Sequence, residues 1–229
     1  MQLAALYPIV YQILKPSFPN CLWAGAKTSR AIALTFDDGP HPQYTPALLQ
    51  VLDRYNIPVS FFWLGACVNR VPTMARDIYQ RGYWIGLHGY DHTSFPFLKP
   101  DVLKQSLENT QDAIAQACQI DPDNIRDVRP PNGLFTPQTL NLLQQWNYRP
   151  VMWSVVPEDW ERPGVCVVVQ RVLRQVQNGS LIVLHDGYYG GQDVAETAAI
   201  LIPQLLQQGY QFVTIDQLWQ QAQPLDNIN

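Results

Sequence analysis

Short apolar runs alternate with longer amphipathic stretches along most of the chain. The apolar runs have the length and composition of buried strands, bounded by turn-forming residues. They predict seven strands, at Ala31–Phe36, Val59–Leu64, Tyr83–Leu87, Asp127–Arg129, Pro150–Ser154, Ser180–Leu184 and Gln211–Ile215.

The stretches between these runs have helical periodicity, as in "TPALLQVLDRYN" and "DVLKQSLENTQDAIAQACQ". Several begin at Thr, Asp or Pro and end at Asn or Gly, which are ordinary helix boundaries. Strands that alternate with helices, without a break in composition, predict one α/β domain with a parallel sheet. An open doubly wound sheet usually has a Gly-rich first turn, which is absent here. We therefore predict a distorted (β/α) barrel of about seven parallel strands.

The two ends of the chain differ from this pattern. The start, "MQLAALYPIVYQIL", is apolar for about a dozen residues, fewer than the roughly 20 that span a bilayer. It lacks the basic start and the small-residue cleavage site of a secretory signal. We expect residues 1–28 to form an apolar segment packed on the domain, with an envelope-facing anchor as the alternative. A catalytic domain over 29–222 and a tail over 223–229 follow, with no transmembrane span.

Composition and charge narrow the class of protein. The chain has 229 residues, of which 47% are hydrophobic and 15% charged, as in a globular protein with a substantial core. A net charge of −4 argues against a nucleic-acid partner. The four cysteines form no CxxC pair, so we interpret them as free thiols that leave the redox compartment open.

Polar side chains gather at the predicted carboxyl ends of five strands. In parallel α/β barrels these ends form one rim, where catalytic residues collect. The residues are Asp37, Asp38, His88, His92, Arg129, Asp159, Trp160 and His185.

Two neighbouring aspartates at a strand end repel each other when both are ionised. Successive strand residues point to opposite sides, so Asp37 and Asp38 can have different roles, and a bound cation would offset the repulsion. His88 and His92 are spaced i, i+4, which predicts that one helical turn directs both imidazoles to one point. Two histidines and one carboxylate make a three-ligand site with an open position, as in hydrolytic zinc enzymes.

The motifs "TFDDGP", "HGYDH", "RPPNG", "EDW" and "VLHD" occur in an order and spacing that resemble the polysaccharide deacetylases. This family has the NodB-homology domain and forms carbohydrate esterase family 4; the resemblance runs from about Ala31 to Ile215. It implies a barrel that removes N- or O-acetyl groups from sugar polymers. It also implies that Asp38, His88 and His92 hold one divalent metal, zinc first, with cobalt or nickel as alternatives.

The same resemblance implies the catalytic roles. Asp37 would be the general base, held by Arg129, and His185 the general acid, oriented by Asp159. A purely structural salt bridge is the alternative for Arg129. The backbone N–H just past Pro131, that of Asn132, would stabilise the oxyanion. Aromatic rings near the rim would stack on sugars or pack in the core; we select Trp160, Tyr90 and Tyr188 as substrate-binding.

The sequence departs from the family pattern at three positions. Asn132 replaces a usual aromatic residue, Val156 replaces the first aspartate of "DxxDW", and Val183 replaces a leucine. None of the three removes a predicted ligand, base or acid. They therefore bear on the choice of substrate.

These residues predict a metal-dependent deacetylase of an N-acetylated glycan, such as chitooligosaccharide or peptidoglycan. The alternatives are an esterase of acetylated xylan, an enzyme acting on another acyl or amide substrate, and a catalytically silent carbohydrate-binding domain. We expect a glycan partner and a monomer. The substrate class suggests the cell envelope or periplasm, and the lack of a cleavable signal leaves the cytoplasm as the alternative.

Overall fold

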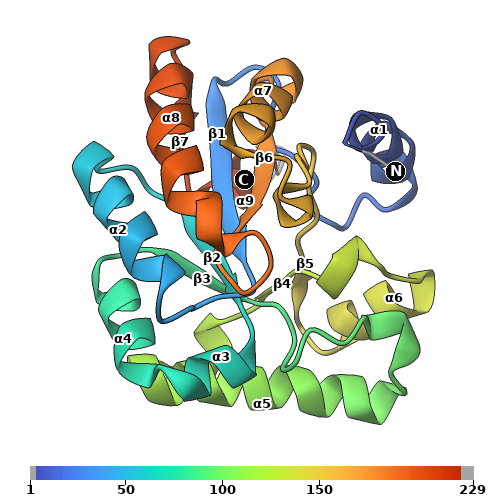
Figure 1. Ribbon diagram of the computed structural model, residues 1–229. Helices are drawn as coiled ribbons and strands as arrows, with labels where there is room; N and C mark the ends of the chain where they lie inside the picture. Colours follow the sequence, from blue (N-terminus) through green and yellow to red (C-terminus); the bar gives the residue numbers. More distant parts are fainter. Residues whose placement is uncertain (1–3, 223–229) are drawn as a thin grey trace, which may run out of the picture.

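A curled sheet of seven parallel strands forms the centre of the computed structural model, which describes residues 4–222 (Figure 1). The strands run in the order β5-β4-β3-β2-β1-β6, and β7 pairs with the start of β1. Their bounds are β1 Ala31–Asp37, β2 Ser60–Trp63, β3 Trp84–Leu87, β4 Asp127–Val128, β5 Arg149–Pro150, β6 Leu181–His185 and β7 Gln211–Phe212.

Helices cover the outside of this sheet. Local signals define their ends: Oγ1 of Thr136 accepts a hydrogen bond from the backbone N–H of Thr139 at the start of α6, and α2 ends at Asn56 in the left-handed conformation. The α-helices are α1 Tyr7–Ser17, α2 Tyr44–Tyr55, α3 Gly65–Arg70, α4 Pro72–Gln80, α5 Pro100–Cys118, α6 Pro137–Gln145, α7 Val165–Gln175, α8 Val194–Gln207 and α9 Ile215–Ala222. The 3₁₀ segments are η1 Phe95–Phe97, η2 Pro122–Asn124, η3 Pro131–Gly133, η4 Asp159–Glu161 and η5 Gly191–Asp193.

The prediction of seven parallel strands in a distorted barrel is confirmed. All seven residues of β1 are buried, as expected for a strand covered on both faces. The fifth strand is shorter than predicted, because the chain beyond Pro150 pairs elsewhere. The backbone N–H of Met152 donates to the carbonyl of Leu22, in the segment before β1.

The barrel is incomplete between β5 and β6, and we call this gap the seam. These two strands form no ladder with each other; single bridges join Leu22 to Val151 and Val155 to Ile182. The backbone N–H of Gly25 donates to the carbonyl of Gly179, just before β6. The N-terminal segment therefore fills the seam and continues the barrel wall.

Helix α1 lies beside the seam. The ring of Tyr11 is buried 6.4 Å from that of Trp23, and the ring of Tyr7 meets Trp153 edge-on at 5.1 Å. Between residues 4 and 222, no helix has the length and apolar character needed to cross a bilayer. The predicted tail at 223–229 lies outside the described residues.

Replacement of Trp23 by alanine tests how much the seam contributes to stability. Trp23 is fully buried and its ring lies 5.7 Å from that of Trp153, so Trp23→Ala leaves a cavity. We expect the free energy of unfolding to fall by about 3–5 kcal/mol in urea denaturation. Phe97→Ala is the control, because Phe97 is 79% exposed and its removal should cost less than about 0.5 kcal/mol. Equal losses in the two variants would contradict a structural role for the seam.

Candidate active site

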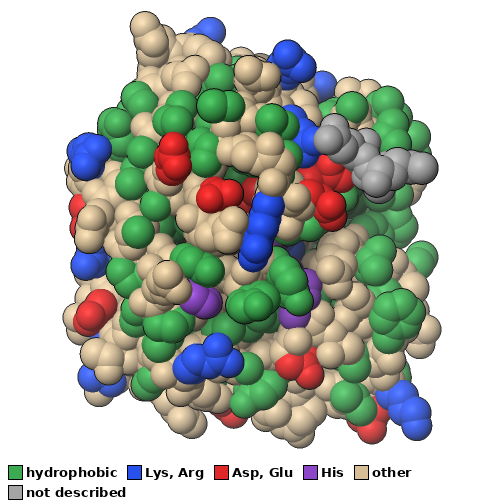
Figure 2. Space-filling view, viewed as in Figure 1, with side chains coloured by type: hydrophobic (Ala, Val, Ile, Leu, Met, Phe, Trp, Pro, Cys, Tyr) green, Lys and Arg blue, Asp and Glu red, His purple; other side chains and the backbone are tan. Residues whose placement is uncertain are grey.

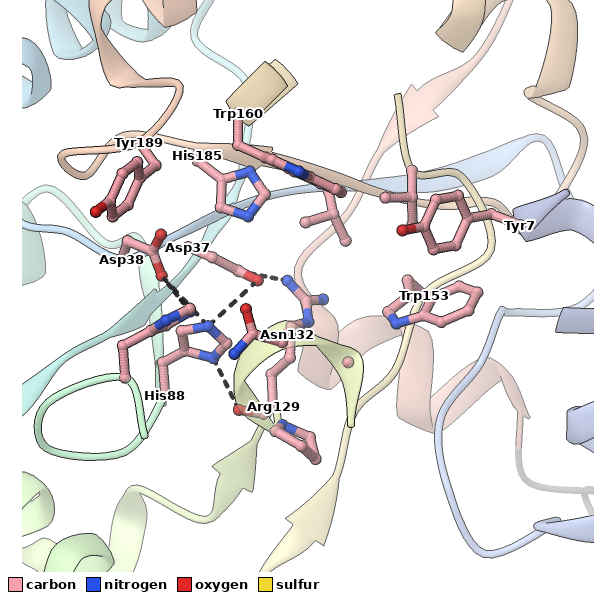
Figure 3. Close-up of a pocket in the computed structure, with 15 residues that line it drawn as sticks. Tyr7, Asp37, Asp38, His88, Arg129, Asn132, Trp153, Trp160, His185 and Tyr189 are labelled. Atoms are coloured by element: carbon pink, nitrogen blue, oxygen red, sulfur yellow. Dashed lines mark hydrogen bonds and ion pairs between the residues drawn. The ribbon is translucent and has the colours of Figure 1, made fainter. Parts of the chain in front are cut away.

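The predicted rim residues converge on one cavity of about 380 Å³ (Figure 3). Asp37 ends β1, His185 ends β6, and His88 and Arg129 directly follow β3 and β4. Asp38, His92 and Trp160 line the same cavity, while Asp159 lies behind His185. Parallel strands that end at one rim bring these side chains together from distant parts of the chain.

A tight turn after β1 separates the two aspartates. Asp38 has a left-handed backbone, with φ of 73°, and Gly39 follows it. A Cβ at Gly39 would collide with the carboxylate of Asp186, so glycine is required there. Asp186 is buried and accepts a hydrogen bond from the hydroxyl of Thr45. Asp186 therefore packs against the turn at Gly39. The turn leaves Asp37 and Asp38 facing different partners.

Asp38, His88 and His92 have the arrangement of a metal site. One ligand atom from each lies within 4.8 Å of the other two. Oδ1 of Asp38 is 3.4 Å from Nε2 of His88 and 3.2 Å from Nε2 of His92, yet it is buried without a hydrogen bond. A buried carboxylate oxygen without a donor is costly, and a cation bound between these atoms would satisfy it. The three residues therefore fit a divalent metal.

The protonation of these groups also suits metal binding. Nδ1 of His88 lies 2.8 Å from the carbonyl oxygen of Arg129, so Nδ1 carries the proton and Nε2 presents its lone pair. Burial alone would raise the pKa of Asp38, but the interaction with His88 and the charges of His185 and His92 hold it well below its usual range. Burial, with the charge of His88, lowers the pKa of His92. Ionised carboxylate and neutral imidazole are the ligating forms.

The prediction that one helical turn aligns His88 and His92 is wrong. Residues 88–94 form a loop, in which His92 has a φ of 67°. Hydrogen bonds from the start of α3 hold this loop, because the backbone N–H groups of Gly65 and Ala66 donate to the carbonyls of Gly89 and Tyr90. The convergence of the two imidazoles depends on this left-handed residue.

Arg129 holds Asp37. Its Nη1 donates to Oδ1 of Asp37 at 2.5 Å and to Oγ1 of Thr35 at 2.8 Å, and Nη2 donates to the carbonyl of Met152 at 3.2 Å. The guanidinium lies 4.0 Å over the ring of Phe62. Arg129 is therefore fixed on several sides, and Oδ2 of Asp37 is left to face the cavity, 4.0 Å from Nε2 of His88.

Asp159 orients His185. Oδ1 of Asp159 lies 2.8 Å from Nδ1 of His185. Oδ2 of Asp159 accepts a hydrogen bond of 2.8 Å from the backbone N–H of His185. The ring of Trp160 meets the imidazole edge-on at 5.2 Å. Burial alone would lower the pKa of His185, but Asp159 and then Asp38 raise it to about 10. The geometry leaves Nε2 of His185 free to give a proton to a bound substrate.

The predicted substrate-binding residues divide into two groups. Asn132 and Trp160 line the cavity. Asn132 has a φ of 59°, its side chain donates to the hydroxyl of Ser94 at 2.8 Å, and its backbone N–H has no hydrogen-bond partner among residues 4–222. Pro131, Tyr90 and Tyr188 do not line the cavity, so their assignment stays a prediction. Tyr90 lies instead in a separate surface depression.

Other residues of the cavity wall were not selected from the sequence as site residues. Trp153, Tyr189, Val156 and Val183 line the cavity, and so does Tyr7 of α1. The valines were visible only as departures from a family pattern. No sequence signal identifies Tyr7, because α1 reaches the cavity through the way the N-terminal segment fills the seam.

Comparison with known proteins identifies the family. The family model for polysaccharide deacetylases matches residues 24–151. A peptidoglycan-N-acetylglucosamine deacetylase of Bacillus cereus is 32% identical over 204 residues, which cover 86% of this chain and 91% of that protein. The chain belongs to the polysaccharide deacetylase family. A chitooligosaccharide deacetylase of a Bradyrhizobium species is 33% identical and covers 83% of this chain and 91% of its own length.

Solved structures agree with this assignment. The crystal structure of a peptidoglycan N-acetylglucosamine deacetylase, Bc1960, aligns with a TM-score of 0.83 at 28% identity and covers 88% of this chain and 93% of its own. A family 4 carbohydrate esterase pseudoenzyme from Bacillus anthracis aligns with a TM-score of 0.78 at 26% identity. The alignment covers 86% of this chain and 67% of that chain. Because the fold occurs with and without activity, the site residues have to carry the functional argument.

Removal of one carboxylate tests the metal site. We expect purified protein to hold about one divalent ion per chain and Asp38→Ala to lose it, since three ligands are needed to hold the ion tightly. Asp91→Ala is the matched control: Asp91 lies next to His92 in sequence, but its carboxylate faces the backbone of Thr93. Elemental analysis after dialysis measures the metal content. Retention of the ion by Asp38→Ala would contradict the site.

Proposed function

We propose that this chain is a metal-dependent deacetylase that hydrolyses N-acetyl groups on glucosamine residues of chitooligosaccharide or peptidoglycan. The observation that carries the proposal is the shared cavity: the possible metal ligands, the Arg129-held Asp37 and the Asp159-held His185 all face it. The names of the relatives support the substrate class.

Zinc is the metal that we propose, with cobalt or nickel as alternatives. Two imidazole nitrogens and one carboxylate oxygen are a donor set typical of catalytic zinc, which leaves a position open. When bound, such an ion supplies a Lewis acid that polarises the acyl oxygen and makes coordinated water more acidic.

Two different residues of the cavity carry out the two proton transfers of the reaction. Asp37 accepts a proton from the attacking water at Oδ2, because its other oxygen is engaged by Arg129. Such a base contributes roughly 10²–10⁴ in rate. His185 donates a proton from Nε2 to the leaving nitrogen, while Asp159 holds Nδ1. The backbone N–H of Asn132, which has no partner among residues 4–222, donates to the developing oxyanion.

A glycan fits the open side of this cavity. Tyr189 lines it and is 61% exposed, and Asn132 is also exposed, so a polymer can approach from there. Lys and Arg side chains are scattered over the face shown in Figure 2 and form no continuous basic patch. A neutral sugar chain therefore suits this face better than a polyanion.

Acetate release from a panel of substrates tests the proposal. With zinc, cobalt or nickel supplied, we expect turnover of chitin oligomers or peptidoglycan, and little or none of acetylxylan. Turnover of acetylxylan alone would favour the esterase. No turnover of any substrate would favour a silent binding domain.

Asp37→Asn tests the base. The variant keeps the shape of the side chain but cannot accept the proton, so we expect acetate release to fall by roughly 10²-fold or more while the metal is retained. Asp91→Asn provides the control for a nearby aspartate outside the cavity. Full activity of Asp37→Asn would show that another group is the base.

Asp159→Asn tests the acid. His185 must be protonated to donate, so activity falls as pH rises through its pKa, which Asp159 helps to raise. Removing the charge of Asp159 lowers the pKa of His185. The alkaline limb of the pH–rate profile should therefore shift to lower pH by at least about one unit. Glu161→Gln is the control, since Glu161 is exposed and should leave the limb in place. An unchanged limb in Asp159→Asn would contradict the role of His185.

A further inference from the structure

The cavity does not end at the catalytic residues. It continues toward the seam, where Tyr7 and Trp153 lie on the side opposite Asp38 (Figure 3). Val156 and Val183 line it as well. We call the part lined by Tyr7, Trp153, Val156 and Val183 the seam compartment.

The seam compartment is buried and mainly apolar. Val156 and Val183 are each 4% exposed and Trp153 is 8% exposed, in contrast to Tyr189 on the open side. Val183 precedes His185 by two residues on β6 and therefore faces the same side of the sheet. The bridge between Val155 and Ile182 brings the chain around Val156 beside it. The compartment is thus a continuation of the site at its buried end.

Reaction geometry decides which part of a substrate can reach this end. An acyl carbon under attack carries four groups: the acyl oxygen, the attacking oxygen, the leaving nitrogen and the alkyl part of the acyl group. Under the proposed function, the acyl oxygen would face the backbone N–H of Asn132 and the ion that Asp38, His88 and His92 would hold. The attacking oxygen faces Asp37, and the leaving nitrogen faces His185. A sugar polymer needs the open side. The alkyl part is the one group left for the seam compartment.

We propose that the enzyme removes N-acyl groups longer than acetyl, such as propionyl and butyryl, and binds their alkyl carbons in the seam compartment. The inference rests on the proposed function and uses the same reaction. The C–N bond of the amide breaks, water supplies the new C–O bond, and the products are the free carboxylic acid and the amine. Additional methylene groups gain free energy when they leave water for an apolar wall.

Helix α1 supplies the far wall. The half-buried ring of Tyr7 packs edge-on against Trp153, and in Figure 3 the Tyr7 hydroxyl points toward the cavity. The family model begins at residue 24, so this wall comes from outside the matched region.

A series of substrates that differ in the acyl group alone tests the inference. The probes are glucosamine trimers that carry N-acetyl, N-propionyl or N-butyryl groups, assayed with the metal-loaded full chain. We expect kcat/KM to rise by up to about fourfold for each added methylene and at least to stay level. A fall from acetyl to propionyl would overturn the inference.

Two substitutions that reduce the volume of the seam compartment test whether the alkyl carbons bind there. Val156→Leu and Val183→Leu should each lower the butyryl-to-acetyl ratio of kcat/KM about tenfold. Val167→Leu makes the same change on α7, outside the cavity, and should keep the wild-type ratio. An unchanged ratio in both filled variants would overturn the assignment of the compartment. Cleavage of acetyl alone by the wild type contradicts this inference only, whereas no cleavage of any trimer contradicts the proposed function as well.

Discussion

The buried guanidinium of Arg129 is the group on which the site depends. Two adjacent carboxylates end β1, and neither can stay ionised below the surface without nearby positive charge. Arg129 neutralises Asp37 directly, and its own carbonyl oxygen fixes the tautomer of His88, which faces Asp38. One residue at the end of β4 thus holds the base and orients a metal ligand. Replacing its side chain would leave the buried carboxylate of Asp37 without its cation, whereas the backbone carbonyl that orients His88 would remain.

Three residues at the same rim have a strained backbone. Asp38, His92 and Asn132 all adopt the left-handed conformation, which costs of order 1 kcal/mol or more for a residue other than glycine. Each of the three turns a functional group toward the cavity that an ordinary strand end or helical turn would direct elsewhere. The surrounding hydrogen bonds, such as those that α3 donates to the loop before His92, maintain these conformations.

Much of the fold and the polar part of the site could be predicted from the sequence, because parallel strands end at one rim. Asp37, Asp38, His88, Arg129 and His185 follow from that rule alone. The loop conformation of His92 could not be predicted, since the i, i+4 spacing equally fits a helical turn and the decisive hydrogen bonds come from distant residues. Tyr7 could not be placed either, because its position depends on how Leu22 pairs with Val151 across the seam.

The position of α1 separates two parts of the enzyme that could change independently. The acid, the base and the metal ligands belong to strand ends and a rim loop of the barrel, whereas Tyr7 belongs to helix α1, before the first strand. Changes in this first helix would alter the shape of the cavity without touching the groups that transfer protons. The N-terminal segment is therefore a place where descendants of one ancestor could diversify in substrate preference at little risk to the chemistry.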